Sequence, residues 1–264
     1  MLFKKNTEPE MVEREDGLID YDVYVMSKTE KMINIILASA VLFGIGYLCY
    51  RSIILSTLLM IFSIKWPPMR VKQIIAKRHS ELAVQFKDML YSVSSSLSAG
   101  KSLEMGLKES LQDLRIIYPD DDTYIIQELS YIVRGIEMNE TVEDMFAQFA
   151  ERAHNEDIEN FVDILRTCKR TGGDMVQVIK TTSNTIGEKI EIKQEIQTMI
   201  SGKKFEFKAL MVMPVFLILL LSVSSADYMA PVFDTVLGHI VMTIAIVMFF
   251  VAYLVGSKIM DIDV

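Results

Sequence analysis

The chain has 264 residues, 51% of them hydrophobic, and its mean hydropathy of +0.29 is too high for an ordinary soluble enzyme. Its formal net charge of -8 argues against binding of nucleic acid, because contacts to a phosphate backbone need clustered basic residues. The composition therefore predicts a membrane protein, with apolar segments that can be located along the sequence.

Residues 1–31 are predicted to form a cytoplasmic N-terminal segment. It contains the long acidic stretch "TEPEMVEREDGLIDYD", which stands where a secretory signal peptide would carry a short basic region. The stretch "SKTE", Ser27–Glu30, has the spacing of a capping box. A helix should therefore begin just before the first apolar run.

Two uncharged apolar runs come next, Met32–Cys49 and Ser52–Ile64. A single helix through both would be about 50 Å long, whereas the hydrocarbon core of a bilayer is ~30 Å thick. We therefore expect a transmembrane hairpin over residues 32–66 with Arg51 at its outer turn, although the second run is short for a span.

Two further uncharged runs, Ala209–Ala226 and Ile240–Gly256, predict a second hairpin over residues 209–256 and a tail over residues 257–264. Lysine and arginine residues gather beside the inner ends of the four runs, whereas the two outer loops contain only Arg51. By the positive-inside rule both hairpins point outward, so both termini and the central region are expected to be cytoplasmic.

The region between the hairpins, residues 67–208, has apolar residues at helical spacing throughout. Six helices are predicted, over residues 71–97, 103–114, 123–134, 141–153, 157–171 and 174–200. Short joints between amphipathic helices are typical of antiparallel bundles. The fold class is therefore predicted to be all-α: a polytopic membrane protein with four transmembrane helices and a six-helix antiparallel cytoplasmic bundle.

Three of the joints share one pattern, a glycine that should end one helix and a short oxygen-bearing side chain that should cap the next. They lie in "LSAGKSLEMGL", "VRGIEMNETVEDMF" and "CKRTGGDMVQVI". The corner residues are Gly100, Ser102, Gly135, Thr141, Gly172, Gly173 and Asp174. The double glycine could also suggest a phosphate-binding loop, but it follows a helical pattern and lacks the Gly-Lys-Ser/Thr of such a loop. A structural role is therefore favoured for all three corners.

Four stretches carry a family resemblance. The first two are the "L-x-A-G-x-S-L" corner at Leu97–Leu103 and "CKRTGGDMVQVIKTTSNTIGEK" at Cys168–Lys189. The other two, "SGKKFEFKALMVMP" at Ser201–Pro214 and "DYMAPVFDTVLGHIVM" at Asp227–Met242, adjoin predicted membrane helices. With these stretches and its helix order, the chain resembles the type II secretion system F family after residue 31, and most closely the tight adherence (Flp pilus) B/C branch.

The resemblance implies an inner-membrane platform protein with no enzymatic activity of its own. In the proteins that the chain resembles, a six-helix F domain docks on a hexameric secretion ATPase, and the membrane helices help to move pilin subunits into a growing filament. Longer members of the family have two F domains. The single F domain expected here implies pairing with a second copy or with a second platform protein.

A membrane transport protein is the alternative function, as a four-helix channel or carrier subunit with a regulatory bundle. Ion and proton carriers usually place ionisable side chains inside the membrane. The four apolar runs contain no Asp, Glu, Lys, Arg or His, which favours the platform function.

No catalytic, cofactor-binding or metal-binding motif is recognised in the sequence. Asp120–Asp122 could hold a divalent cation, but three adjacent acids after a proline are more typical of a solvated loop. His79, His154 and His239 lack the spacing of metal ligands, and no "GxSxG" motif is present.

Basic residues near the corners of the bundle are candidates for the ATPase interface, because their side chains suit polar protein interfaces and lie beside apolar stripes. They are Arg134, Arg152, Arg166, Lys169 and Arg170. A solvated surface is the alternative interpretation of the same residues.

Gly202, in "SGKKFEFK", is the candidate hinge between the sixth helix and the third membrane run. A stiff helix with one weak point could transmit motion of the bundle into the bilayer. Equally, the glycine could ease the helix through the headgroup layer while the nearby lysines contact anionic membrane lipid.

Overall fold

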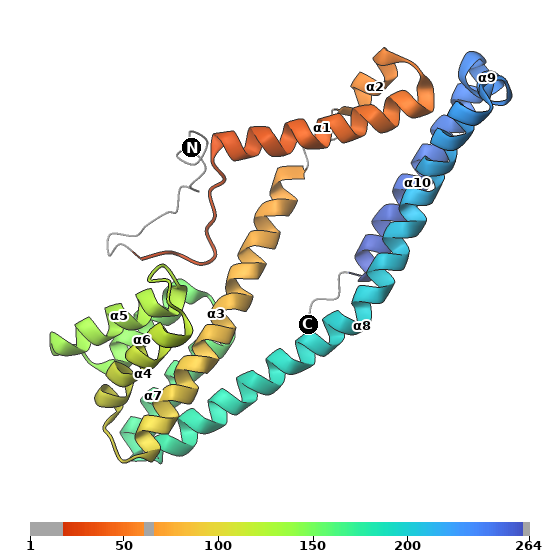
Figure 1. The fold of residues 1–264 in the computed structure, drawn as a ribbon. Coiled ribbons are helices and arrows are strands. Elements are labelled where there is room, and N and C mark those ends of the chain that lie inside the picture. Colours follow the sequence, from red (N-terminus) through yellow and green to blue (C-terminus); the bar gives the residue numbers. More distant parts are fainter. Residues whose placement is uncertain (1–17, 61–65, 261–264) are drawn as a thin grey trace. The chain divides into compact units, whose positions relative to one another are not determined.

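The computed structural model of the chain describes residues 18–60 and 66–260. Within these residues the chain is helical and forms no β-strand (Figure 1). The helices are α1 (Lys28–Tyr50), α2 (Ile53–Met60), α3 (Trp66–Ser98), α4 (Leu103–Ile117), α5 (Tyr124–Glu137), α6 (Val142–Ala153), α7 (Glu156–Thr171), α8 (Met175–Ser224), α9 (Ala226–Asp234) and α10 (Val236–Met260). The predicted helical character is therefore confirmed.

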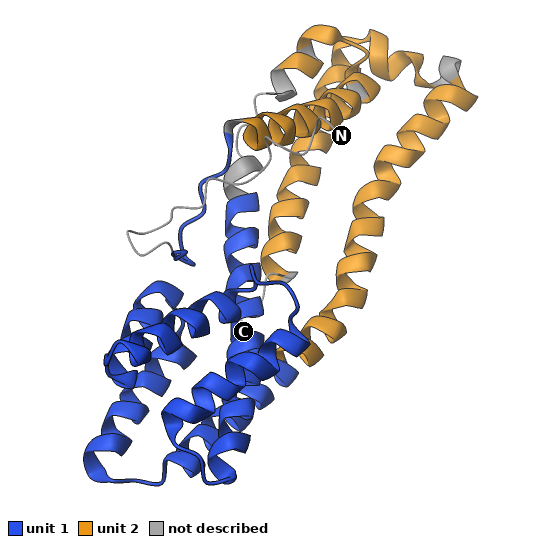
Figure 2. Ribbon diagram, turned by 60° about the vertical axis from the view of Figure 1, so that its left-hand side comes forward, with its two compact units in different colours: residues 1–27, 70–192 blue, residues 28–69, 193–264 orange. Residues whose placement is uncertain are grey.

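The chain divides into two compact units, coloured blue and orange in Figure 2. The first unit comprises the chain up to Ser27 together with Arg70–Ile192. The second comprises Lys28–Met69 and Lys193–Val264. The boundaries at Met69 and Ile192 lie inside α3 and α8, so both of these helices contribute to both units.

The first unit has one hydrophobic core, to which α3, α4, α5, α6, α7 and the first part of α8 all contribute. Phenylalanine rings form its centre: the Phe86 ring lies 5.9 Å from that of Phe149 and 5.5 Å from that of Phe161, both edge-on. Each ring belongs to a different helix and projects from its apolar face. Aromatic pairs in this geometry add specific packing to the burial of apolar area.

The second unit contains three helices that are long and apolar enough to cross a membrane, counted over the described residues. They are Thr29–Leu48 in α1, the apolar end of α8, and Val236–Ile259 in α10. Their large apolar side chains are largely exposed in the protein itself; Leu210, for example, has 68% of its surface exposed. Contiguous apolar surface of this size requires a lipid or protein environment.

The fourth predicted span corresponds to α2 and the residues after it. Helix α2 has eight residues and is thus about 12 Å long, which is far too short to cross a bilayer alone. Residues 61–64 of the predicted run lie outside the described residues.

In the second unit, a small apolar cluster joins the end of α1 to α9 and α10. It consists of Tyr50, Met229, Phe233 and Met242. The Tyr50 hydroxyl lies 2.9 Å from Thr243 Oγ1, so α1 and α10 share a hydrogen bond. Arg51, predicted at the outer turn, takes a φ of 48° between α1 and α2, and its guanidinium lies 5.0 Å from the centre of the Phe233 ring.

Helix α8 continues without interruption through Gly202 over 50 residues. The sixth predicted helix, expected to end near Ile200, and the third predicted span are therefore one helix. Within α8, Pro214 is the residue that cannot donate a backbone hydrogen bond to the preceding turn. Local weakness in the helix is thus expected at Pro214 as well as at Gly202.

Candidate functional site

Two of the predicted corners close in the expected way. Gly100, with a φ of 83°, follows α3, and Ser102 Oγ accepts a 3.3 Å hydrogen bond from the Met105 amide at the start of α4. Thr141 Oγ1 accepts a 3.2 Å bond from the Asp144 amide at the start of α6, and its hydroxyl donates to the Asp144 carboxylate at 2.7 Å. These side chains satisfy amides that a helix N-terminus otherwise leaves unpaired.

The prediction that Gly135 ends its helix is wrong. Gly135 lies inside α5, which continues to Glu137, and the left-handed residue that follows the helix is Asn139, with a φ of 69°. The Glu140 amide then donates to the Gly135 carbonyl at 2.9 Å, which closes the helix end. Gly135 serves packing instead, since a Cβ at this position would collide with the side chain of Met145 in α6.

At the third corner, the two glycines have different roles. Gly172 has the positive φ, 68°, and is the C-cap of α7. Gly173 does not have a positive φ. A Cβ at this position would lie 3.0 Å from Cys168 Sγ, so a glycine is favoured here because a side chain would be crowded. Asp174 Oδ1 accepts a 3.1 Å bond from the Gln177 amide at the start of α8. The geometry of "RTGGDMVQV" is therefore that of a helix corner.

Arg152 cannot belong to an exposed interface, which corrects the prediction for this residue. Only 2% of its side chain is exposed, and its Nη2 lies 2.6 Å from Oε2 of Glu128, a fully buried carboxylate of α5. Its Nε donates to Glu128 Oε1 at 3.3 Å, and its guanidinium lies 5.2 Å from the centre of the Tyr131 ring. A buried charge of this kind requires a paired, hydrogen-bonded partner.

The other four candidate residues are exposed. Arg166, Lys169 and Arg170 lie on α7, with Arg166 and Arg170 one turn apart. Lys169 Nζ pairs with the Glu143 carboxylate of α6 at 2.6 Å. Arg134 lies on α5 and donates from Nε to the Ser130 carbonyl at 3.2 Å. The structure therefore groups three of the five candidates on α7.

A short segment before α1, residues 18–24, was not recognised as part of the bundle from the sequence. Tyr21 is 1% exposed and belongs to the core of the first unit. Its hydroxyl donates to Glu128 Oε1 at 3.2 Å, and its amide donates to the Arg152 carbonyl at 3.0 Å. The partners of Tyr21, Glu128 and Arg152, belong to other helices far along the chain, so no local pattern in the sequence indicated this docking.

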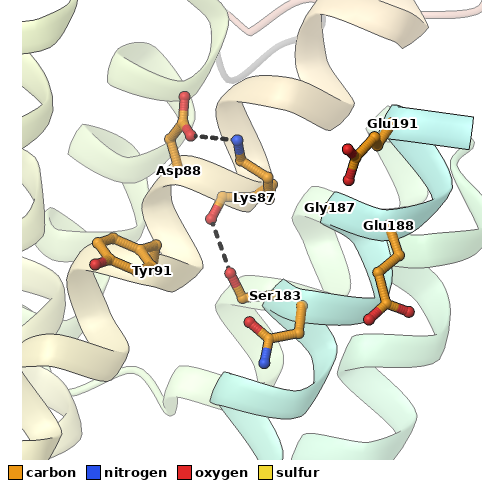
Figure 3. Close-up of a pocket in the computed structure, with 8 residues that line it drawn as sticks. Lys87, Asp88, Tyr91, Ser183, Gly187, Glu188 and Glu191 are labelled. Carbon is orange, nitrogen blue, oxygen red and sulfur yellow. Dashed lines mark hydrogen bonds and ion pairs between the residues drawn. The ribbon is translucent and has the colours of Figure 1, made fainter. Parts of the chain in front are cut away.

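A groove between α3 and α8 has a volume of about 480 Å³, and Figure 3 shows the side chains that line it. The Lys87 ammonium pairs with Asp88 at 2.9 Å, and the Ser183 hydroxyl donates to the Lys87 carbonyl at 3.3 Å. The Tyr118 hydroxyl donates to Asp88 at 2.6 Å, and burial, together with this bond, raises the pKa of Tyr118. The groove is lined by Lys87, Asp88, Tyr91, Ser183, Asn184, Gly187, Glu188 and Glu191, and none of these is a histidine or a cysteine.

The histidines and the acidic triplet make structural contacts. His154 Nε2 lies 3.2 Å from Asp20 Oδ1, and His79 Nε2 lies 3.8 Å from Asp22 Oδ1. His239 stacks on the Tyr50 ring at 6.1 Å. In the loop at Asp120–Asp122, the Asp120 carboxylate accepts a 3.0 Å bond from the Asp122 amide. Among the described residues, no group of three His, Cys, Asp or Glu side chains is arranged to hold a metal ion.

A model of the family "Type II secretion system (T2SS), protein F" matches residues 89–223. The chain belongs to this family. The match begins within α3, includes α4 to α7 and ends at the last turn of α8, and it confirms the family that the sequence resembles. Comparisons with curated proteins and with solved structures found no match. Proteins of the T2SS F family are membrane platform proteins rather than enzymes, and the family and the three apolar helices together indicate a multi-pass protein of the inner membrane.

Proposed function

We propose that this chain is the inner-membrane platform protein of a type II secretion or Tad/Flp-like pilus assembly machine. It couples a cytoplasmic secretion ATPase to the extraction of pilins from the bilayer and to filament assembly. The observation that carries the proposal is the family match over residues 89–223, because this region joins a helical bundle to an apolar helix within one continuous α8.

The proposed topology has four spans, with the bundle and both termini in the cytoplasm. Lysine and arginine residues lie beside the inner ends of the apolar runs, as the positive-inside rule requires for this orientation. The second span would consist of α2 and the apolar residues that follow it in the sequence. A six-helix antiparallel F domain then places α7 and the α7–α8 corner in the cytoplasm.

The Tad/Flp-like assignment rests on the corner and membrane-flanking stretches that resemble this branch, such as "SGKKFEFKALMVMP" at Ser201–Pro214. The bundle is a single F domain in this proposal. A platform with one such domain would pair with a second copy or with a second platform protein. Pilin subunits and membrane lipid are the remaining partners.

The proposed ATPase contact is the exposed face of α7 that carries Arg166 and Arg170. Guanidinium groups recognise carboxylates with two parallel hydrogen bonds and are frequent in protein interfaces. Lys169 already pairs with Glu143, and Arg134 lies on a different helix. Arg166 and Arg170 are therefore the residues to test.

The test is copurification of the cognate secretion ATPase with the full-length protein in detergent. Reversing both charges, Arg166→Glu and Arg170→Glu, should lower ATPase recovery at least tenfold without unfolding the bundle, because two interface charges become repulsive. Arg115→Glu, at an exposed arginine of α4 outside the candidate set, is a matched control. Equal recovery for the double variant and the wild type at moderate salt would reject this surface, and no recovery with the wild type itself would oppose ATPase coupling.

A further inference from the structure

Residues 18–24 dock on a face of the bundle formed by α3, α5 and the end of α6. Tyr21 fills the centre of this docking site: its hydroxyl reaches Glu128 of α5, and its ring meets the Tyr124 ring edge-on with the centroids 5.4 Å apart. Leu18 and Ile19, beside it, are 6% exposed each. The segment therefore inserts an aromatic anchor into the core and is not simply laid over the surface.

The backbone on the C-terminal side of the anchor forms a tight turn. The Asp22 amide donates to Asp20 Oδ1 at 3.1 Å, and the Val23 amide donates to the Asp20 carbonyl at 3.4 Å. Such a turn, stabilised by an Asp side chain, fixes the direction of the residue inside it. Tyr21 is that residue, so the turn presents the ring to the bundle.

Two histidines and an arginine of the bundle surround the turn. His154 at the end of α6 faces Asp20, and His79 of α3 faces Asp22. Arg78 donates from Nη1 to the Val23 carbonyl at 3.4 Å, and its guanidinium lies 4.8 Å from the centre of the Tyr24 ring. The site thus fits one chemical class of occupant, a tyrosine between two carboxylates followed by a second aromatic residue.

The floor of the site is the buried ion pair of Glu128 and Arg152. Burial, reinforced by the charge of Glu128, raises the pKa of Tyr21 well above its ordinary value of 10.0, so the hydroxyl remains a proton donor to the carboxylate. A charged floor can be hydrated when the tyrosine leaves, whereas an apolar floor would leave an exposed cavity. This chemistry suits a segment that docks reversibly.

We propose that residues 18–24 are a docking strap that ties the first membrane helix to the bundle. The structural basis is that Tyr24 lies only four residues before α1 begins at Lys28, so docking restrains the N-terminal end of this span. The strap lies outside the part of the chain that matches the T2SS F family, residues 89–223.

Hydrogen exchange of the full-length protein in lipid nanodiscs, read over residues 18–27, tests the strap directly. Tyr21→Ala removes the anchor, and the amides of this segment should exchange on the order of tenfold or more faster than in the wild type. Tyr21→Phe keeps the ring but loses the bond to Glu128, so exchange should rise about fivefold. Tyr91→Ala, at a tyrosine of α3 that is 72% exposed, is the control and should change nothing in the segment.

Exchange in α7 separates strap release from unfolding of the bundle, because α7 contributes Phe161 and Leu165 to the core. If Tyr21→Ala also exposes α7, the milder Tyr21→Phe variant decides the question. Unchanged exchange of residues 18–27 in Tyr21→Phe, with α7 protected, would overturn the proposal. If the proposed platform function is also correct, Tyr21→Ala should assemble fewer filaments, and this expectation rests on that function. Hydrogen exchange does not depend on filament assembly, so the strap and the platform function can be rejected independently.

Discussion

Gly172 and Gly106 occupy different kinds of position, and alanine should have opposite effects at the two. Gly172 has a φ of 68°, which costs a residue with a Cβ ~1 kcal/mol or more. Gly106 lies inside α4, where an added Cβ would meet Ser96 Cβ at an ordinary 3.5 Å. There, alanine should gain up to about 1 kcal/mol from helix propensity.

The buried thiol of Cys168 allows both changes to be measured by thermal unfolding with a thiol-reactive dye, in a Cys49→Ser background. Gly172→Ala should lower the unfolding midpoint and Gly106→Ala should raise it. Shifts of the same sign would show that local conformation does not govern these two sites.

His79 should make the first unit less stable in mild acid. Burial lowers the pKa of His79 below its ordinary 6.5, with a smaller contribution from His154, while Asp22 and Asp20 oppose the shift. The unfolded chain therefore binds more protons than the folded one near this pH, so stability falls as the pH drops through about 6.5. His79→Gln should reduce this loss when unfolding is followed from about pH 8 to about pH 5. A variant that loses stability as steeply as the wild type would exclude His79 as a source.

At the scale of the helices, α5 and α6 are joined by the ion pair of Glu128 and Arg152. Arg152→Met should destabilise the bundle by about 3 kcal/mol or more, because it leaves the Glu128 carboxylate buried without its partner. The double variant Glu128→Leu/Arg152→Met should recover much of this loss, since no uncompensated charge remains. Denaturation of Glu128→Leu, Arg152→Met and the double variant gives the coupling directly, and additive effects of the two substitutions would contradict it.

Helix periodicity in the sequence predicted most helices of the first unit, because each helix buries one apolar stripe against a shared core. The caps at Ser102, Thr141 and Asp174 depend on residues within one turn and were equally readable. The role of Gly135 could not be predicted in this way. Asn139, and not Gly135, has the left-handed conformation after the helix, and Gly135 is required because the side chain of Met145 in α6 leaves no room for a Cβ.

Contacts between distant parts of the chain explain what the sequence did not reveal about the candidate site. Arg152 stands beside an apolar stripe, as an exposed arginine also can, and its burial depends on Glu128 in another helix. The docking of Tyr21 joins residues 107 positions apart. Patterns within one helix carry no information on such partners, so local periodicity predicted the helices but not their polar contacts.

Helix α8 offers a test of the hypothesis that it transmits motion of the bundle into the bilayer, with Gly202 as the candidate hinge. It runs through Gly202 as a regular helix, and a Cβ at Gly202 would meet no other atom within 4 Å. Gly202→Ala should therefore be tolerated in the fold and stiffen the helix slightly. Gly202→Pro removes an amide donor and clashes with the preceding turn, so it should abolish filament assembly while membrane insertion and ATPase binding persist. Normal filament numbers in the proline variant would leave Gly202 with no mechanical role.

At the scale of the whole molecule, the chain combines a bundle of the T2SS F family with apolar helices that need a membrane. The two units are covalently connected through α3 and α8, and the proposed strap would add a restraint just before α1. A carrier or channel would need a polar path through its apolar helices. The four apolar runs of the sequence contain no Asp, Glu, Lys, Arg or His, which agrees better with the proposed platform function than with a carrier or channel.

Filament assembly in a strain that lacks this chain tests the platform function most directly. Surface filaments are counted by electron microscopy in the deletion strain and after complementation with the wild-type chain, with pilin and ATPase levels monitored in parallel. The proposed function predicts that filaments disappear on deletion and return on complementation, while the levels of pilin and ATPase stay unchanged. Wild-type numbers of filaments in the deletion strain would contradict it.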